Sequence, residues 1–221
     1  MNELKIDLSD KTIINLVGPS AVGKTTLINE IDKIYPNFSK VISYTTRQPR
    51  QGESLDTYRF IDAGSANIEM LKQQSVQYDQ FPGTEIIYGT EPEDYKNEFN
   101  ILDTLSTSVD TFRNLGFAAC KQFIVVTSPS EWQKRIDTRE FKEQQLLTRY
   151  EEAVKSLTWS MNENDRVKWI YNKSGYLQKA AELIVRLSAD PEEFEKYKDH
   201  NPKEIGHDLL QYIKYLKKGA K

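Results

Sequence analysis

The feature that most constrains the fold is a short glycine-containing segment, residues 18–25, that follows one apolar run and opens another. Thr12–Val17 has the sequence T-I-I-N-L-V, and its β-branched apolar residues predict a buried strand that ends at Gly18. From Lys24 to Tyr35, apolar side chains recur at helical spacing. The order of strand, glycine loop and helix predicts an α/β core in which the loop is held at one edge of a sheet.

The composition of this loop is typical of a phosphate-binding site. Residues 18–25 fit the pattern G-x-x-x-x-G-K-S/T in the strand-loop-helix context that the pattern requires. Its glycines let successive backbone N–H groups point inward, and the start of the helix adds positive potential. We expect Lys24 to reach the β- and γ-phosphates of ATP and the Thr25 hydroxyl to bind Mg²⁺. The predicted ATP-binding residues here are Gly18, Pro19, Ser20, Ala21, Val22, Gly23, Lys24, Thr25 and Thr26.

The rest of the chain alternates in a way that favours a mainly parallel sheet covered by helices. Short apolar runs at 99–102, 123–126 and 168–171 predict further strands. A capped helix start follows Ser128, and residues 135–165 are charged and mostly helical in character. Residues 39–90 mix aromatic side chains with Thr, Arg, Gly and Pro, which predicts an inserted lobe rich in strands.

Composition excludes several classes of protein. The 30 Lys and Arg residues are outweighed by 33 Asp and Glu, so no general attraction to nucleic acid or anionic membranes is expected. The apolar runs are far shorter than the roughly 20 residues that a membrane-spanning helix needs. The N-terminal residues resemble neither a signal nor a transit peptide, so we expect a cytoplasmic protein. Cys120 is the single cysteine, which excludes an internal disulfide.

The C-terminal residues 188–221 contain two more capped helix starts, at Asp190 and Asn201. After the second, apolar side chains form one stripe at helical spacing. We expect this stripe to pack on the domain, with a partner surface as the alternative. The stripe consists of Ile205, Leu209, Tyr212, Ile213 and Leu216.

A second candidate anion site lies in residues 43–53, S-Y-T-T-R-Q-P-R-Q-G-E. Arg47 and Arg50 place two forked cations on a short loop stiffened by proline, which suits a dianionic monophosphate. Tyr58 and Tyr88 each offer a hydroxyl donor to the same phosphate.

This segment resembles the signature S-x-T-T-R-x-P-R-x-G-E of guanylate kinases, and residues 56–60, D-T-Y-R-F, resemble the D-Y-x-F that follows it. The resemblance covers roughly residues 12–187. It implies ATP-dependent phosphorylation of GMP or dGMP with Mg²⁺, by a monomer or homodimer that binds neither nucleic acid nor membrane. It also implies a three-layer core (1–38 and 91–187), an acceptor lobe (39–90) and a lid (about 135–165), with 188–221 as a helical extension.

The resemblance also assigns roles to single residues. It implies that Arg47, Arg50, Tyr58 and Tyr88 hold the acceptor phosphate. Base recognition falls to Ser43, Thr90 and Asp79, where Asp79 is shorter than the family's glutamate and Gln77 is a competing candidate. In residues 101–103, I-L-D, Asp103 is implied near Mg²⁺ and the acceptor, while Leu105 replaces a second aspartate that helps to recognise guanine.

The implied lid carries the remaining catalytic cations. Arg139 and Arg149 correspond to the family's two phosphate-contacting arginines, although ten positions separate them, one fewer than in the family. With Lys24 and Arg47 they form the predicted catalytic set, and Arg135 is a further candidate. Asn172 corresponds to a position that borders the adenine of ATP.

Two other interpretations stay open from the sequence. Asp79 and Leu105 motivate a kinase of the same fold that acts on a different nucleotide or a ribosyl phosphate. A guanylate-kinase-like interaction module without catalysis is the second alternative, although Gly23, Lys24 and Thr25 are intact.

Overall fold

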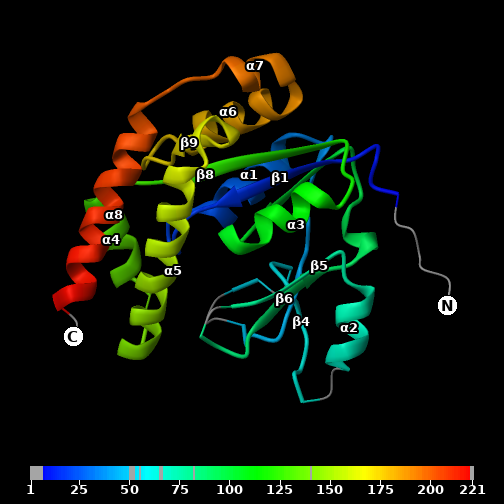
Figure 1. The fold of residues 1–221 in the computed structure, drawn as a ribbon, viewed down its shortest axis with the longest axis horizontal. Helices are drawn as coiled ribbons and strands as arrows, with labels where there is room; N and C mark the ends of the chain where they lie inside the picture. Colours follow the sequence, from blue (N-terminus) through cyan, green and yellow to red (C-terminus); the bar gives the residue numbers. More distant parts are fainter. Residues whose placement is uncertain are drawn as a thin grey trace.

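A computed structural model describes residues 7–49, 53–54, 56–64, 67–81, 83–139 and 141–219. These residues form a five-stranded and a four-stranded sheet (Figure 1). The larger sheet has the order β2-β7-β1-β8-β9, and all its pairings are parallel, as the sequence predicted. Its strands are β1 (Thr12–Val17), β2 (Phe38–Lys40), β7 (Phe99–Asp103), β8 (Ala119–Val126) and β9 (Lys168–Tyr171).

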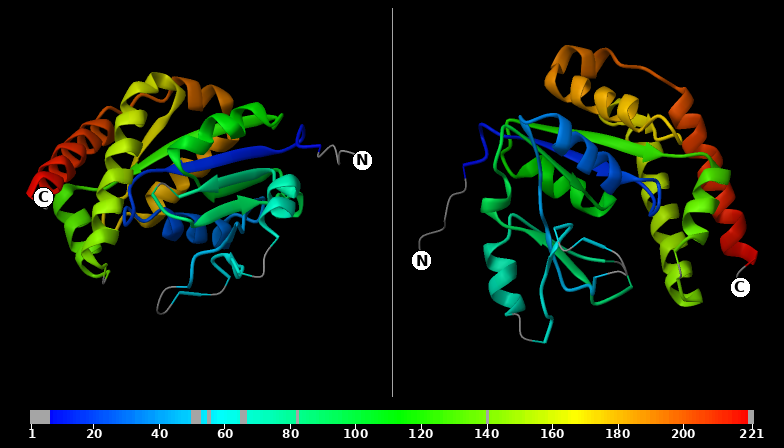
Figure 2. Two further views of the ribbon diagram at one scale, coloured as in Figure 1. Left: turned by 60° about the horizontal axis from the view of Figure 1, so that its bottom comes forward. Right: turned by 180° about the vertical axis from the view of Figure 1, so that it is seen from behind.

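Helices cover both faces of this sheet, which explains why β1 is buried along its whole length. On one face α1 (Lys24–Ile34) packs against α6 (Leu177–Ala189). The opposite face carries α3 (Val109–Asn114) and α5 (Glu143–Asn162) (Figures 1 and 2). The result is the expected three-layer α/β core.

The smaller sheet forms a separate lobe below the large one in Figure 1. Its order is β4-β3-β6-β5, with β3 and β4 parallel and the other pairs antiparallel. The strands are β3 (Tyr44–Thr45), β4 (Arg59–Phe60), β5 (Gln77–Gln80) and β6 (Ile87–Thr90). Strand β2 continues in the large sheet to Lys40, so the chain enters the lobe only after that residue.

The lobe also contains a helix, α2 (Ile68–Gln74), which the sequence analysis did not predict. None of its residues is buried, so it has no continuous apolar stripe to mark it in the sequence. The Asn67 side chain accepts a hydrogen bond from the backbone of Met70 and caps its start.

Two further elements differ in extent from the prediction. Strand β8 begins at Ala119 because the polar residues before Phe123 are buried, and the Lys121 ammonium lies 4.1 Å from the centre of the Phe194 ring. The helical stretch expected over 135–165 is split into α4 (Pro129–Asp137) and α5.

The C-terminal helices pack on the domain, as expected from their apolar stripe. Helix α7 (Pro191–Lys196) is capped by the Asp190 side chain, and α8 (Asn201–Gly219) lies beside α5. Gly206 of α8 lies so close to β9 that a β-carbon on it would be 2.4 Å from the Trp169 ring. An ion pair of 3.1 Å joins Lys217 of α8 to Glu151 of α5.

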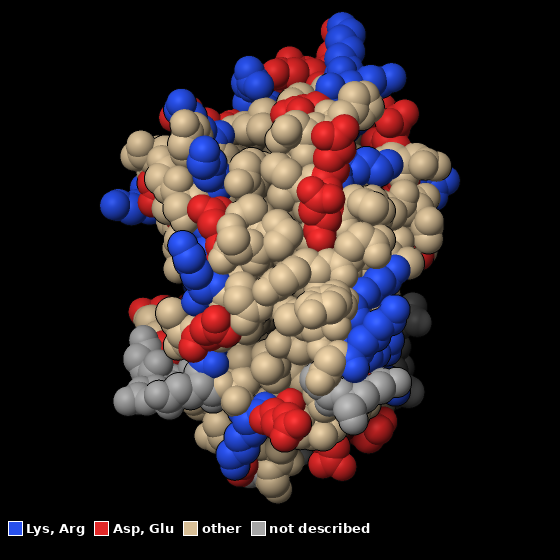
Figure 3. Space-filling view, turned by 90° about the vertical axis from the view of Figure 1, so that its left-hand side faces the viewer, with Lys and Arg blue, Asp and Glu red and all other residues tan. Residues whose placement is uncertain are grey.

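The remaining short elements are η1 (Pro92–Asp94), η2 (Ser106–Ser108) and η3 (Asn164–Arg166). Figure 3 views the molecule from the side on which α8 lies, where cationic and anionic side chains are interspersed. Among the described residues, no helix combines the length and the apolar character that crossing a membrane would require.

Candidate active site

A cleft opens where the carboxyl ends of β1 and β7 face the lobe. These two strands are neighbours, and Leu16 pairs with Asp103, so the glycine loop after β1 lies beside the end of β7. The loop, the lobe and helix α5 all line this one cleft. The predicted site residues among its lining are Gly18, Ser20, Ala21, Gly23, Lys24, Thr25, Thr26, Ser43, Tyr58, Asp79, Tyr88, Asp103, Arg139 and Arg149.

The glycine loop has a shape that needs its two glycines. Gly18 has φ 144° and Gly23 has φ 96°, values at which a residue with a β-carbon is strained. Space is lacking as well, because a β-carbon on Gly18 would lie 2.3 Å from the carbonyl oxygen of Val125. A β-carbon on Gly23 would likewise lie 2.3 Å from the side-chain nitrogen of Asn172. The loop therefore lies tightly against β8 and the segment after β9.

Side chains from other elements hold the loop's carbonyl groups. The Trp132 indole nitrogen donates to the Ser20 oxygen over 2.9 Å. The Val22 oxygen accepts from Asn172 Nδ2 (2.8 Å) and from the Arg135 guanidinium (3.0 Å). Asn172 thus supports the loop from outside, and neither it nor the loop residues Pro19 and Val22 are among the residues that line the cleft. The structure places Asn172 behind the loop, where it supports the backbone.

Lys24 lies at the centre of the loop and is only 8% exposed. Its Nζ donates to the carbonyl oxygens of Gly18 and Pro19, at 2.5 and 3.0 Å, and lies 3.6 Å from Asp103 Oδ1. A loop that wraps its own lysine in this way holds a positive charge at the point where a phosphate chain would bind.

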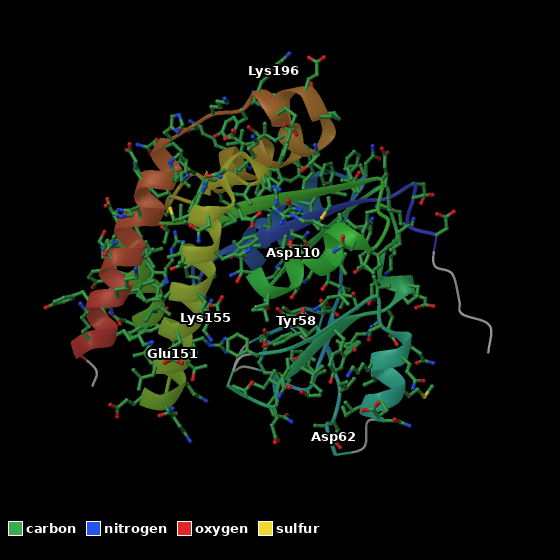
Figure 4. The ribbon with its side chains drawn as sticks, in the orientation of Figure 1. Tyr58, Asp62, Asp110, Glu151, Lys155 and Lys196 are labelled. Atoms are coloured by element: carbon green, nitrogen blue, oxygen red, sulfur yellow. The ribbon has the colours of Figure 1, made fainter. Side chains whose placement is uncertain are left out.

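The lobe contributes aromatic and polar side chains to the opposite wall. The rings of Tyr58 and Tyr88 meet edge to face with centres 5.7 Å apart. Figure 4 shows Tyr58 on the side of the lobe that faces the large sheet, whereas Asp62 lies at the far end of the lobe. The two predicted phosphate-binding tyrosines therefore share one wall of the cleft with Ser43 and Asp79.

Arg47 lies one layer behind this wall. Both terminal nitrogens of its guanidinium lie 2.8 Å from the Glu53 carboxylate, and its centre is 5.2 Å from the Tyr58 ring centre. Burial, the largest single cause, lowers the pKa of Arg47, but hydrogen bonds and charge interactions with Glu53 and Tyr88 together outweigh it, so the pKa is raised. Its Nε is buried and has no hydrogen-bond partner among the described residues. The predicted partner cation, Arg50, lies outside the described residues.

The two candidate base-contacting residues of β5 and β6 differ in position. Asp79 lines the cleft, where its Oδ2 accepts hydrogen bonds from Gln77 Nε2 and from Ser108 Oγ. The Thr90 side chain is fully buried, and its hydroxyl shares a 2.7 Å hydrogen bond with the Tyr95 hydroxyl. The structure therefore does not bring Thr90 to the cleft.

Helix α5 closes the third side of the cleft. Arg139, just before it, and Arg149, on its second turn, both line the cleft. The Arg149 guanidinium lies 4.4 Å from the centre of the Phe81 ring in the lobe. Core, lobe and α5 are thus in contact around one cavity.

Sequence analysis missed Glu152, which lines the same cleft from α5 and is 8% exposed. Burial, supported by the charge of Asp103, raises its pKa to about 7, although Lys24 and Arg149 act in the opposite direction. The available signal was its spacing, since Glu152 follows Arg149 by three positions and shares its helix face.

Oxygen ligands for a divalent cation are present at the loop. Thr25 lines the cleft from the first turn of α1, and Asp103 lines it from the end of β7. Mg²⁺ is usually held by one or two protein oxygens, with phosphates and waters as its other ligands. The chemistry of these two side chains therefore fits this ion.

Comparison with known proteins adds independent information. The guanylate kinase family model matches residues 9–173. A guanylate kinase of Synechococcus elongatus is 27% identical over 143 residues, which cover 62% of this chain and 77% of that protein. One from Thermobifida fusca is 26% identical over 135 residues, 57% of this chain and 65% of that protein.

A solved structure supports the fold. The crystal structure of a guanylate kinase from Anaplasma phagocytophilum superposes with a TM-score of 0.54. The match covers 81% of this chain and 85% of that one, at 16% sequence identity. The two proteins therefore share a fold although their sequences have little identity.

Proposed function

Because the chain belongs to the guanylate kinase family, we propose that it transfers the γ-phosphoryl group of ATP to GMP or dGMP, giving ADP and GDP or dGDP. One observation carries the proposal. The phosphate loop around Lys24 and the lobe residues Ser43, Tyr58 and Tyr88 line one cleft, so a donor and an acceptor phosphate can meet there.

Positioning and charge account for the reaction. The loop and Lys24 hold the β- and γ-phosphates of ATP, while Tyr58 and Tyr88 hold the acceptor phosphate with the positive charge of Arg47 behind them. An oxygen of that phosphate attacks the γ-phosphorus in line, and the bond to ADP breaks. Arg139 and Arg149 stabilise the charge that spreads over the transferring group. The nucleophile is already an anion, so the step needs no protein base.

Thr25 and Asp103 would hold Mg²⁺ beside the donor phosphates. Bound there, Mg²⁺ would supply positive charge to offset the negative charge of the donor phosphates. Lys24, only 3.6 Å from Asp103, contributes its charge from the adjacent side.

The choice of GMP as acceptor rests on the lobe. Asp79 is an acceptor of hydrogen bonds when ionised, and guanine presents two donor groups, N1–H and the 2-amino group, on one edge. Leu105 also lines the cleft, in the place of a second carboxylate, and this favours testing other acceptors in parallel.

A steady-state assay of ADP release with GMP, dGMP, AMP, CMP, UMP and a ribose bisphosphate tests the proposal. We expect the highest kcat/KM with GMP or dGMP. If GMP ranks among the poorest acceptors, the substrate assignment is wrong and a kinase for another acceptor replaces it.

Substitution of Lys24 by alanine tests catalysis itself. We expect turnover to fall roughly 10²- to 10³-fold, because the variant loses a preorganised charge on the transferring phosphates. The matched control is Lys33→Ala, an exposed position on the same helix, which should keep wild-type turnover. Unchanged turnover in Lys24→Ala would contradict the kinase mechanism.

A further inference from the structure

The sequence analysis did not select Ser108, yet its side chain contacts Asp79, one of the residues that line the cleft. Ser108 is the last residue of η2, which follows the carboxyl end of β7, and it is 1% exposed. Its Oγ donates a hydrogen bond to Asp79 Oδ2, across 29 positions of sequence. We propose that Ser108 is a positioning residue that orients the Asp79 carboxylate toward the base of the acceptor, and this rests on the proposed function.

The bond joins two parts of the molecule that belong to different sheets. Asp79 lies on β5 of the lobe, where it pairs with Tyr88 on β6. The backbone of Ser108 is fixed in the core, since its N–H donates to the Leu105 oxygen over 3.0 Å and η2 packs against α5. A group fixed to the core therefore sets the direction of a side chain carried by the lobe.

The hydrogen bonds on Asp79 are unevenly distributed. Oδ2 accepts from both Ser108 and Gln77, and no described residue donates to Oδ1. Oδ1 is therefore the oxygen available to a ligand. An ionised carboxylate only accepts, so the base it meets must offer N–H donors, as guanine does on its N1 and 2-amino edge.

Gln77 alone would not orient the carboxylate in the same way. It lies two positions from Asp79 on the same strand and therefore moves with the lobe. Ser108 supplies the only hydrogen bond described between Asp79 and the core. Its removal should leave the carboxylate in the cleft but let it rotate, so recognition of the acceptor weakens while the donor side is unaffected.

Steady-state kinetics of Ser108→Ala test this effect. We expect KM for the acceptor to rise about tenfold, the size of a lost hydrogen bond to a charged group. The kcat value and KM for ATP should stay within about twofold, because the phosphate sites are untouched. Thr107→Ala, an exposed neighbour on the same turn, is the matched control and should behave as wild type. Ser108→Cys fills similar space with a weaker donor and should give a smaller rise in KM.

A double-mutant cycle with Asp79→Ala separates positioning from general damage to the fold. If Ser108 acts through Asp79, then Ser108→Ala has no further effect on KM in the Asp79→Ala background. Additive effects of the two substitutions would overturn the proposal, as would an equal change in KM for both substrates. Should Ser108→Ala not fold, as judged by thermal unfolding, Ser108→Cys takes its place in the cycle.

The cycle is measured with whichever acceptor the wild-type protein prefers. If that acceptor is not GMP or dGMP, the proposed function fails, while coupling between Ser108 and Asp79 is still decided by the cycle. If GMP is preferred and the effects are additive, the proposed function stands and only the role of Ser108 is rejected.

Discussion

Glu152 is a buried carboxylic acid in the lining of the cleft proposed to bind phosphates. Its pKa is raised from 4.5 to about 7, chiefly by burial. Lys24, Arg149 and Asp103 are the charged groups that act on it, and the two cations only partly offset the cost of burial. Near neutral pH the side chain therefore exists as a mixture of the neutral acid and the carboxylate.

This shift predicts how stability depends on pH. The folded protein binds the Glu152 proton more tightly than the unfolded chain does. The contribution of Glu152 to the free energy of unfolding is therefore complete below about pH 4.5 and is lost as the pH rises through about 7. Glu152→Gln removes this loss, and at pH 8 the variant should be more stable than wild type by up to about 3 kcal/mol.

Urea unfolding at pH 5 and pH 8 measures this difference. The control is Glu182→Gln on α6, an exposed position that should leave the pH dependence of the free energy of unfolding as in wild type. If the difference in free energy of unfolding between Glu152→Gln and wild type is the same at pH 8 as at pH 5, the raised pKa of Glu152 is contradicted.

The sequence predicted site residues that belong to one continuous motif, but it did not predict those that tertiary packing brings to the cleft. Lys24 and Thr25 follow from one continuous motif, because the loop that holds them is local in sequence. Glu152 and Ser108 reach the cleft only through the packing of α5 and η2 around it, and no local pattern specifies that packing. For Thr90 the motif predicted a contact with the acceptor but could not reveal that the side chain is buried with its hydroxyl bonded to Tyr95.

At the scale of elements, helix α8 is fixed by a close approach to β9. Gly206→Ala would place a methyl group 2.4 Å from a carbon of the Trp169 ring. The clash should lower the free energy of unfolding by about 1–3 kcal/mol, more than the helix propensity of alanine restores.

Gly219→Ala in the same helix is the matched control. A β-carbon there meets nothing within 4 Å, so we expect a neutral or slightly stabilising effect. Chemical denaturation of both variants compares them directly. Equal stability of the two alanine variants would show that α8 does not depend on its contact with Trp169.

Elements were predictable where apolar periodicity was strong. β1, β9 and the start of α4 appear where the sequence placed them, because continuous apolar runs and a Ser-Pro cap mark them. The exposed helix α2 and the polar first half of β8 were missed for one reason. Their stability comes from capping or from burial under α7, and neither leaves a periodic apolar pattern.

At the scale of the whole molecule, three parts surround one cleft: the core, the lobe and α5. The proposed function assigns the two substrates to different walls, so we expect hydrogen exchange with a non-hydrolysable ATP analogue alone to slow mainly at the phosphate loop. Adding GMP as well should slow exchange in β5, β6 and the first turns of α5, as closure excludes water. A third measurement uses GMP alone. If the protection with both ligands is only the sum of the protection with the ATP analogue alone and with GMP alone, closure is contradicted.

Trp132 joins the phosphate loop to the wall formed by α5. Its side chain is fully buried, its indole N–H is held by the Ser20 oxygen, and its ring centre lies 6.0 Å from that of Tyr150. Indole emission depends on the surroundings of the ring, so we expect the fluorescence of Trp132 to change when a nucleotide binds at the loop. Trp159 and Trp169 lie in α5 and β9 and contribute the remaining tryptophan emission.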